Sequence, residues 1–451
     1  MRALLISANT EQLQMPVLPM GLACVAATAE HAGHDVSLLN LMTKDGFQDP
    51  CSTAGELLSP ASILQAGNLA GVPTALENAV SGFNPEIVGV SVRNIDDQCM
   101  KSPKFLLDAV RKVVTACRGL TSAPIVLGGA GYSMYPQSAL NYLGADMGIK
   151  GEGEAPFVKL LDVLSRKEDL ARVPNLVVAE PSLETRTEIM KRIDDSVLPD
   201  PGGLFSFPTE FGNQKIWLPF QTRRGCSMDC SYCSTATIEG RILRKRSLDV
   251  VIDSISRFVG AGFKNFFFVD NIFNFPPSYA NELCDRLIGK NLEIQWRAIL
   301  YPWSVDEGLI ERMAKAGCVE VSLGFESGSR KVLRSLNKRF EPEDVRSISK
   351  MLDKHGIGRM GFLLLGGPAE TRQTVEESLE FADSLELEAM KITAGIRIYP
   401  YTALAAAAEA EGVVSPGDDL LGPKFYLARG LEGWIDDTIS GWLKKRPNWH
   451  S

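Results

Sequence analysis

Three of the nine cysteines lie close together between Thr222 and Ile238, as Cys226, Cys230 and Cys233 in a C-x3-C-x2-C spacing. Cysteine thiolates hold iron–sulfur clusters, and a cluster that only carries electrons takes four of them. Three thiolates without a nearby fourth leave one iron of a 4Fe–4S cluster open to bind another molecule. An open coordination position is typical of a catalytic metal site rather than a structural one. The spacing therefore predicts a catalytic 4Fe–4S cluster on these three cysteines.

Other uses of three close cysteines are a structural zinc site, a disulfide or an accidental cluster in a loop. A structural zinc site takes four ligands, and no histidine or fourth cysteine lies near in the sequence. The remaining cysteines do not suggest a disulfide framework, because most of them lie in apolar or helical stretches typical of buried thiols. These are Cys24, Cys117, Cys284 and Cys318, whereas Cys51 and Cys99 lie in less regular stretches. This usage predicts a reducing compartment.

The surroundings of the cysteines resemble the radical S-adenosylmethionine (SAM) superfamily. Tyr232 directly precedes the last cysteine, and the strand-like segment IWLPFQT (216–222) leads into the first. The resemblance implies that the open iron binds the amino and carboxylate groups of SAM. One electron from the cluster then cleaves SAM to a 5′-deoxyadenosyl radical, which abstracts hydrogen from a substrate. It also implies an electron donor, either a flavodoxin or ferredoxin or a dedicated reductase.

Strands and helices alternate six times between residues 216 and 411, which is too few for a closed eight-fold barrel. The resemblance implies an open partial (β/α)6 barrel with its reactive centre at the carboxyl ends of the strands. The expected strands are IWLPFQT, NFFFVDN, IQWRAIL, VEVSLGF, RMGFLLLGG and MKITAGIRI. We expect residues 412–451 to form a C-terminal tail that covers the mouth of this barrel.

Polar residues at the expected strand ends are the candidate ligands of SAM. SLGFESGS (322–329) resembles the fourth-strand segment that contacts the ribose and methionine portions, GFLLLGGPAE (361–370) the glycine motif beside the adenine, and IRIYP (396–400) the segment that packs on it. Alternatively, Glu326 caps the next helix and Gly366-Gly367-Pro368 is only a turn. The predicted cofactor-binding residues are Tyr232, Ser322, Glu326, Gly366, Gly367 and Arg397.

Carboxylates near the strand ends are candidates for general acid or base work. They are Asp270, Glu320 and Glu326, and no single one is favoured. A basic run also surrounds the cysteines. Such a run is usually a solvated face, but here it would also raise the reduction potential of the cluster or receive an acidic flavodoxin-type donor. Its members are Arg223, Arg224, Arg241, Arg244, Lys245 and Arg246.

Residues 1–165 show a second alternation of apolar strands and helices, which predicts a parallel, doubly wound, Rossmann-like sheet. Ligands of such sheets bind outside the carboxyl ends of the strands. PMGLACVAATAEHAGHDV (19–36), PEIVGVSVRNIDD (85–97), PIVLGGAGYS (124–133) and GIKGEGEAPF (148–157) resemble the cobalamin-binding domain fused to many radical SAM enzymes. We expect residues 166–215, rich in proline, to be a linker.

The cobalt-ligating motif D-x-H-x-x-G of methionine-synthase-type domains is absent from the chain. His31 and His34 end the first expected helix, where a cation interacts favourably with the helix C-terminus. Domains of the fused class bind cobalamin without a protein histidine, so two alternatives stay open. The domain binds cobalamin in this way, or it is a scaffold that has lost the cofactor.

Composition narrows the function classes further. The net charge of −8 argues against a nucleic-acid partner, which needs a basic face. No apolar run approaches the roughly 20 residues of a membrane-spanning helix, and MRALLISANT reads as a strand rather than a signal peptide. These features predict a cytoplasmic enzyme acting on a small molecule.

Two reactions remain open for such an enzyme. The overall resemblance, together with acidic strand ends that would suit the ammonium groups of an aminosugar, makes radical dehydration the main expectation, as in the aminosugar deoxygenase of apramycin-type antibiotic biosynthesis. The alternative is a cobalamin-dependent C-methyltransferase, or a ring-rearranging or cyclising enzyme of secondary metabolism.

Overall fold

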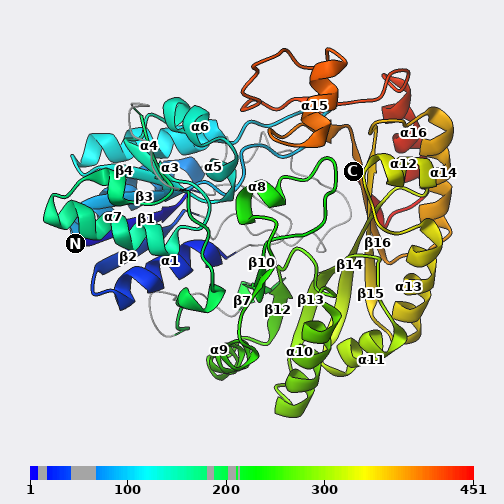
Figure 1. Ribbon diagram of the computed structural model, residues 1–451, viewed down its shortest axis with the longest axis horizontal. Coiled ribbons are helices and arrows are strands. Elements are labelled where there is room, and N and C mark those ends of the chain that lie inside the picture. Colours follow the sequence, from blue (N-terminus) through cyan, green and yellow to red (C-terminus); the bar gives the residue numbers. More distant parts are fainter. Residues whose placement is uncertain (9–17, 42–67, 180–186, 202–209, 212–213) are drawn as a thin grey trace.

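The chain folds into two α/β units that lie side by side (Figure 1). The computed structural model describes residues 1–8, 18–41, 68–179, 187–201, 210–211 and 214–451. The N-terminal unit occupies one end of the molecule, and a larger unit with a curved sheet occupies the other. Cys51 lies outside the described residues.

The N-terminal unit is built on a sheet in the order β2-β1-β3-β4-β5-β6. All neighbours pair in parallel except β5 and β6, which are antiparallel. Its first strands are short apolar runs that are buried on both faces, as parallel sheets require. The expected doubly wound sheet is confirmed. The strands are β1 (Arg2–Ser7), β2 (Asp35–Asn40), β3 (Ile87–Ser91), β4 (Ile125–Gly128), β5 (Met147–Ile149) and β6 (Leu176–Val178).

Helices cover both faces of this sheet. On one face α1 (Met20–His31) packs against α7 (Glu154–Arg166). On the other, α4 (Leu107–Leu120) packs between α3 (Asn68–Phe83) and α6 (Pro136–Leu143). The order of the strands reverses between β1 and β3, which is the point where doubly wound sheets bind their ligands.

The range expected as a linker contributes structure to both units. β6 adds an antiparallel edge strand to the N-terminal sheet. The short 3-10 turn η2 (Leu170–Arg172) precedes β6 and the turn η3 (Ile193–Asp195) follows it, and β7 (Glu210–Phe211) pairs with β8 (Gln214–Lys215). The limits of the domains therefore remain a prediction. Residues 166–215 form more strands than their proline content suggested.

The second unit is an open, all-parallel sheet in the order β19-β16-β15-β14-β13-β12-β9. Burial alternates along β14 and β15, because one face packs on helices and the other lines the interior of the partial barrel. The six expected strands are confirmed as β9 (Leu218–Phe220), β12 (Asn265–Phe268), β13 (Gln295–Leu300), β14 (Cys318–Glu326), β15 (Gly358–Leu365) and β16 (Ala389–Ala394).

Amphipathic helices connect these strands and lie on the outer side of the sheet (Figure 1). Their starts are well defined. Asp306 caps α11 by accepting from the Leu309 N–H, and a capping box formed by Glu341 and Asp344 begins α13. The helices are α9 (Leu248–Gly260), α10 (Pro277–Lys290), α11 (Glu307–Lys315), α12 (Arg330–Ser335), α13 (Pro342–Lys354) and α14 (Arg372–Asp383).

The C-terminal tail adds strands and a helix to the second unit. β18 (Phe425–Tyr426) pairs with β17 (Ile396–Arg397), and β19 (Trp449–His450) extends the sheet at the β16 edge. α16 (Trp434–Leu443) contacts β16, whereas α15 (Ala403–Ala410) precedes the tail. The tail thus closes an edge of the sheet in addition to lying near the strand ends.

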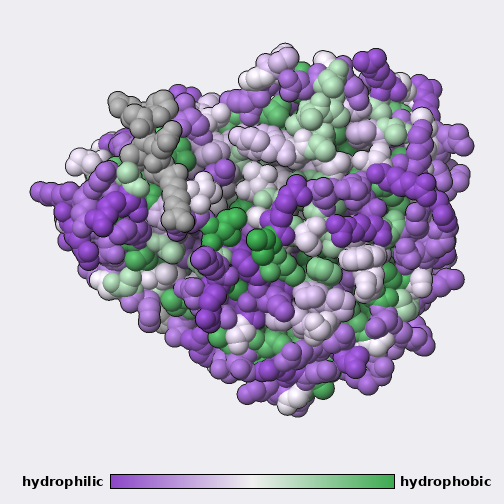
Figure 2. Space-filling view, in the orientation of Figure 1, coloured by the Kyte–Doolittle hydropathy of each residue, from purple (hydrophilic) through white to green (hydrophobic). Residues whose placement is uncertain are grey.

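No helix among the described residues is long and apolar enough to cross a membrane. The face shown in Figure 2 is mostly hydrophilic, with apolar side chains in small patches. The cysteines outside the cluster motif behave as expected, because Cys24, Cys117, Cys284 and Cys318 are buried and none of the described cysteines forms a disulfide.

Candidate active site

The three cysteines lie on one loop between β10 (Arg223–Arg224) and α8 (Thr235–Glu239), and we call this segment, 225–234, the cluster loop. Its backbone is held by hydrogen bonds from Cys226 N to Gly240 O (3.1 Å) and from Cys233 N to Cys230 O (3.2 Å). Cys226 and Cys230 are half-buried, whereas Cys233 is exposed.

The donor set of this loop fits a cluster better than a single metal ion. Among the described residues, no group of three or more His, Cys, Asp or Glu side chains converges closely enough to hold one ion. In a 4Fe–4S cluster each cysteine binds a different iron, so the thiolates need not meet at a point. Burial raises the pKa of the Cys226 and Cys230 thiols. The Lys338 ammonium opposes this but only in part. Cys226, Cys230 and Cys233 would therefore hold the cluster.

A buried polar triad lies directly behind the cluster loop. The Tyr232 hydroxyl donates to Glu326 Oε1 (2.9 Å), and Lys338 Nζ lies 3.1 Å from the same oxygen and 3.0 Å from the tyrosine hydroxyl. Burial alone lowers the pKa of Lys338, but Glu326, Tyr232 and the nearby Cys230 outweigh it and raise that pKa well above its usual range. The triad thus places one fixed cation beside the cysteines.

Glu326 is held in an unusual backbone conformation. Its φ is +62°, in the left-handed region that non-glycine residues rarely adopt, and the pairing of β14 with β15 shifts register between Leu323 and Glu326. Such strain persists only where the surroundings stabilise it, and it is common at functional sites. The bulge turns the Glu326 carboxylate from the end of β14 toward Tyr232 on the cluster loop.

Removing the cation of this triad should destabilise the protein. In Lys338→Met the Glu326 carboxylate stays largely buried with only the Tyr232 hydroxyl as partner, and breaking a buried pair in this way costs about 3 kcal/mol. Anaerobic denaturant titration should show a lower free energy of unfolding, and iron analysis a lower cluster content. The double variant Lys338→Met/Glu326→Gln, which removes both charges, should recover much of the loss. An additive double variant would contradict the coupling.

Asp270 lies in a different place from the expected acid–base site. Its side chain is fully buried, and its two oxygens accept from Thr222 N (2.7 Å), Arg223 N (2.8 Å) and the Arg223 guanidinium (2.8 Å). Both oxygens are therefore committed to the segment that leads from β9 into the cluster loop. This correction makes Asp270 an anchor of that segment rather than a group that meets a substrate.

Glu320 and Ser322 are half-buried and come before Glu326 on β14. Glu320 is six residues before Glu326 on β14, which corresponds to about 20 Å along an extended strand. It pairs with Arg297 (3.3 Å), whose guanidinium stacks on Trp217 at 4.0 Å. Glu320 thus belongs to the amino end of the barrel, which corrects its expected catalytic role. Ser322, between the two, remains a predicted ligand.

The glycine motif after β15 folds around a buried carboxylate. Glu370 Oε2 accepts from Gly366 N (2.5 Å) and Gly367 N (2.9 Å), and Gly366 has a φ of +99° that favours glycine. Glu370 Oε1 is buried and has no hydrogen-bond partner among the described residues. Burial raises the pKa of Glu370 to about 7, although the two backbone hydrogen bonds oppose this. The turn is therefore built on a carboxyl group that takes up a proton.

This turn should make the stability of the protein depend on pH. Since the pKa of Glu370 is raised to about 7 by folding, its contribution is complete below the unfolded value of about 4.5 and is lost as pH rises through 7. Glu370→Gln keeps an acceptor without titrating. We expect its free energy of unfolding to exceed that of the wild type by an amount that grows from pH 4.5 to pH 7 and levels off above pH 7 at about 3 kcal/mol. A pH-independent difference between the two in denaturant titrations would contradict this.

Arg397 is committed to contacts other than the expected one with SAM. Its Nε lies 2.7 Å from Asp96 Oδ2, and its Nη2 donates to Leu420 O (2.9 Å) in the tail. Since the side chain is buried within these contacts, it is not free to bind the cofactor. Arg397 instead joins the two units, which corrects its predicted role.

Most of the basic run is also buried, contrary to the expectation of a solvated or donor-docking face. Arg224 and Arg244 pair with Glu152 and Glu154 of the N-terminal unit at 2.5–3.3 Å. Arg246 donates to Ser196 Oγ (2.7 Å). Arg241 and Lys245 alone in this run are exposed. The arginines thus fasten the cluster loop to its neighbours, because each buried guanidinium requires a partner.

A cavity of about 410 Å³ lies between the two units, next to the cluster loop. The N-terminal unit lines it with the carboxyl ends of β3 and β4, the start of α1 and the turn before α7, which are the parts that surround the reversal point of its sheet. The second unit contributes Pro219, Gln221, Arg224, Glu239 and Val269. The cavity therefore connects the ligand edge of one sheet with the ligand edge of the other.

Glycines let the backbone form the wall of this cavity. A Cβ at Gly21 or Gly128 would meet no atom within 4 Å, so a side chain there would extend into open space. Gly129, with a φ of +98°, packs closely on Val92 O. None of the lining residues is a histidine. The cavity thus fits a large ligand that approaches bare backbone and takes no imidazole from the protein.

Glu239 ties this cavity to the cluster loop. Its Oε2 accepts from Gly225 N (2.9 Å) and from Asn271 Nδ2 (2.6 Å), and its Oε1 accepts from Gln221 Nε2 (2.9 Å). The carboxylate therefore joins the ends of β9 and β12 to the first residue of the loop.

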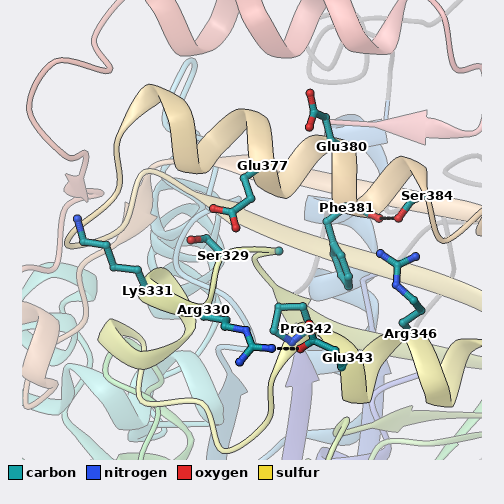
Figure 3. A pocket seen from close by; sticks show the side chains of 11 residues that line it. Ser329, Arg330, Lys331, Pro342, Glu343, Arg346, Glu377, Glu380, Phe381 and Ser384 are labelled. Atoms are coloured by element: carbon teal, nitrogen blue, oxygen red, sulfur yellow. Dashed lines mark hydrogen bonds and ion pairs between the residues drawn. The ribbon is translucent and has the colours of Figure 1, made fainter.

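A larger cavity, about 580 Å³, lies on the outer side of the second unit (Figure 3). It is bounded by α12, α13 and α14, and its charged side chains include Arg330, which pairs with Glu343, and Arg346, which stacks on Phe381. None of the cluster cysteines lines it. The inner cavity is the better candidate for the reactive site, because Arg224 and Glu239, which adjoin and hold the cluster loop, line it.

Comparison with known families agrees with this arrangement. Residues 221–382 match the radical SAM superfamily, and residues 6–161 match the B12 binding domain. The chain therefore carries a radical SAM domain and, before it, a B12-binding domain. A radical SAM domain uses a 4Fe–4S cluster and SAM, which confirms both cofactors expected from the sequence. Such a domain also needs a reductant.

Full-length relatives of this protein include methyltransferases. It is 24% identical over 89% of its length to an uncharacterised methyltransferase of Pyrococcus horikoshii, of which the match covers 83%. It is 22% identical over 90% of its length to the tryptophan 2-C-methyltransferase of Streptomyces laurentii, of which 74% is covered.

Its fold is that of TsrM, a radical SAM methyltransferase from Kitasatospora setae solved with cobalamin and a 4Fe–4S cluster bound. That comparison gives a TM-score of 0.83 at 22% identity, over 100% of this chain and 92% of TsrM. Comparison with the cobalamin-dependent radical SAM enzyme OxsB gives a TM-score of 0.74 at 15% identity, over 98% of this chain and 67% of OxsB.

Several residues of the site carry no clear signal in the sequence. Lys338 lies in the polar segment RSLNKRF with nothing to distinguish it from surface lysines. Glu152 and Glu154 belong to the phrase GIKGEGEAPF, which indicated a domain but no role for either carboxylate. Only the packing of the two units on each other reveals these partners.

Proposed function

We propose that this protein is a cobalamin-dependent radical SAM methyltransferase that acts on a small molecule. The observation that carries the proposal is the glycine-lined cavity between the B12-binding domain and the cluster loop. Full-length relatives named as methyltransferases support methyl transfer over the aminosugar dehydration expected from the sequence. The placement of Asp270 and Glu320 away from the cavity also removes two of the carboxylates that dehydration would have used.

When bound, the cluster would supply the electron for SAM cleavage and cobalamin would carry the methyl group. The residues of the chain orient and shield these groups. Cys226, Cys230 and Cys233 would hold the cluster, and Lys338, paired with Glu326, keeps a positive charge near Cys230. Gly21 and Gly128 leave room for the corrinoid, and Glu239 keeps the loop against that space. Holding the reactants in one geometry supplies a large part of catalysis.

Binding of corrinoid is the decisive measurement. The protein, purified anaerobically, is reconstituted with iron, sulfide and hydroxocobalamin, and corrinoid retained after gel filtration is measured by absorption. We expect about one corrinoid per chain. A protein that retains none in the presence of excess hydroxocobalamin would exclude the proposed methyl transfer.

Product analysis separates methyl transfer from dehydration once a substrate is converted. Methyl transfer yields S-adenosylhomocysteine in addition to 5′-deoxyadenosine, whereas radical dehydration yields only 5′-deoxyadenosine and methionine. Formation of S-adenosylhomocysteine in step with product would support the proposal. Product formation without it would favour the dehydration expected from the sequence.

A further inference from the structure

A buried ion pair, separate from those of the basic run, joins the two units. Asp96 follows β3 in the B12-binding domain, and Arg397 lies on β17 beside the barrel sheet. Asp96 Oδ2 and Arg397 Nε are 2.7 Å apart, and the two side chains are 1% and 2% exposed. The second oxygen of Asp96 accepts from Gln98 N (3.0 Å). A charge pair that is this well enclosed has little freedom to move.

The contact extends along the whole loop after β3. Residues 93–106 cross from the B12-binding domain toward α15 (Figure 1). Met100 packs on the turn between β16 and β17 so closely that a Cβ at Gly395 would lie 2.3 Å from Met100 Sδ. Arg397 also donates to carbonyls of Leu420 and Leu421, so the same guanidinium holds the tail. One arginine therefore fixes a loop of one unit, a strand of the other and the tail.

Each residue of this ion pair is only a few positions in the sequence from another residue of the candidate site. Arg93, three residues before Asp96, lines the cavity between the units. Tyr399, two residues after Arg397, has its ring 5.3 Å from the guanidinium. Burial raises the pKa of Tyr399, and the nearby Asp96 and Cys233 add to this. A shift at Asp96 would thus move the cavity wall relative to the cysteines.

Stability alone does not account for such a pair. The desolvation of two buried charges offsets most of their attraction, so a well-packed apolar pair would stabilise the fold at least as well. A buried charge pair does impose one geometry, because any displacement leaves an unpaired charge in a low-dielectric interior. At the other edge of the cavity, Glu152 and Glu154 pair with Arg224 and Arg244 in the same manner.

We propose that Asp96 and Arg397 are positioning residues that hold the B12-binding domain at one fixed distance from the cluster. The proposal rests on the proposed function, since it takes the cavity to be occupied by a corrinoid. Misplacing reacting groups by about 1 Å can cost roughly a hundredfold in rate, so a rigid separation between the two cofactors is a catalytic requirement.

Electron paramagnetic resonance on the loaded protein tests this directly. Cob(II)alamin and the reduced cluster each carry an unpaired electron, and their magnetic coupling depends steeply on their separation. In Asp96→Asn, which keeps the shape but removes the charge, we expect a distribution of separations at least about twofold broader than in the wild type. Iron and corrinoid contents should match those of the wild type.

The control is Glu388→Gln, which breaks an ion pair with Arg359 (2.7 Å) inside the second unit and should leave the magnetic coupling unchanged. An unaltered coupling in Asp96→Asn would overturn the proposal, and so would loss of corrinoid from a folded variant, since that would make Asp96 a binding residue.

Absence of corrinoid from the wild type would contradict the proposed function instead. The pair is then tested by hydrogen exchange. Asp96→Asn should raise exchange in both residues 93–106 and residues 420–424, and unchanged exchange there would overturn the proposal.

Discussion

Replacing Cys230 by alanine should abolish the reductive cleavage of SAM. Cys230 is half-buried on the cluster loop near Lys338, and its loss leaves two thiolates to hold four irons. We expect the rate of 5′-deoxyadenosine formation, driven by dithionite, to fall roughly a thousandfold, which corresponds to about 4 kcal/mol in the barrier. Chromatography of the nucleosides after anaerobic incubation with SAM measures this rate. Iron analysis should show the cluster content falling with it.

The matched control for that variant is Cys117→Ala. Cys117 is buried in α4 of the B12-binding domain, where it serves as a small apolar side chain, and burial raises its pKa to about 11 so that it stays a thiol. Its replacement should leave both the cluster and SAM cleavage intact. If Cys230→Ala still produced 5′-deoxyadenosine at the wild-type rate, the cluster assignment would be wrong.

Replacing Gly128 by valine should prevent corrinoid binding without affecting the cluster. Gly128 ends β4 at the cavity between the units, and a Cβ there meets no atom within 4 Å. The branched side chain suits a strand and would project into the space that a corrinoid needs. We expect hydroxocobalamin to bind at least roughly a hundredfold more weakly, which corresponds to about 2.7 kcal/mol. An absorption titration measures the affinity, and iron content should equal that of the wild type.

Gly119→Val provides the comparison for this variant. Gly119 also has no atom within 4 Å of an added Cβ, but it lies at the end of α4 and does not line the cavity. Its replacement should leave corrinoid affinity unchanged. Tight binding of hydroxocobalamin by Gly128→Val would show that the corrinoid occupies another part of the protein, and that the cavity has a different ligand.

The hydrophobic periodicity of the sequence and the spacing of its motifs predicted much of the fold. The apolar strands of both units, such as IVGVS (87–91) and the inner and outer alternation of β15, follow from local burial patterns that any parallel α/β sheet requires. The cysteines were also predictable, because the three candidate ligands of the cluster lie within eight residues of one another in this sequence. Strands as brief as β6 and β19 escaped prediction, since two or three residues show no period.

Polar side chains near the site were less predictable. Glu326 and Glu320 stand on the same strand with the same inward direction, yet a bulge and about 20 Å of strand give them different surroundings. Asp270 looked like a free carboxylate at a strand end, but Thr222 and Arg223 occupy both of its oxygens. The role of a charged side chain depends on the group with which it pairs. The partners of these carboxylates are distant in the sequence, so the sequence does not reveal them.

The sequence by itself thus determined the chemistry of the cluster loop and the two α/β units, because both depend on neighbouring residues and on local hydrophobic period. Only the tertiary structure decided which charges are free. In the folded chain, Arg224 and Arg244 of the basic run form buried ion pairs with Glu152 and Glu154. Arg397 likewise pairs with Asp96, which is 301 residues away in the sequence. Burial is a property of the packed units, and an unpaired charge within them would cost more than the fold can sustain.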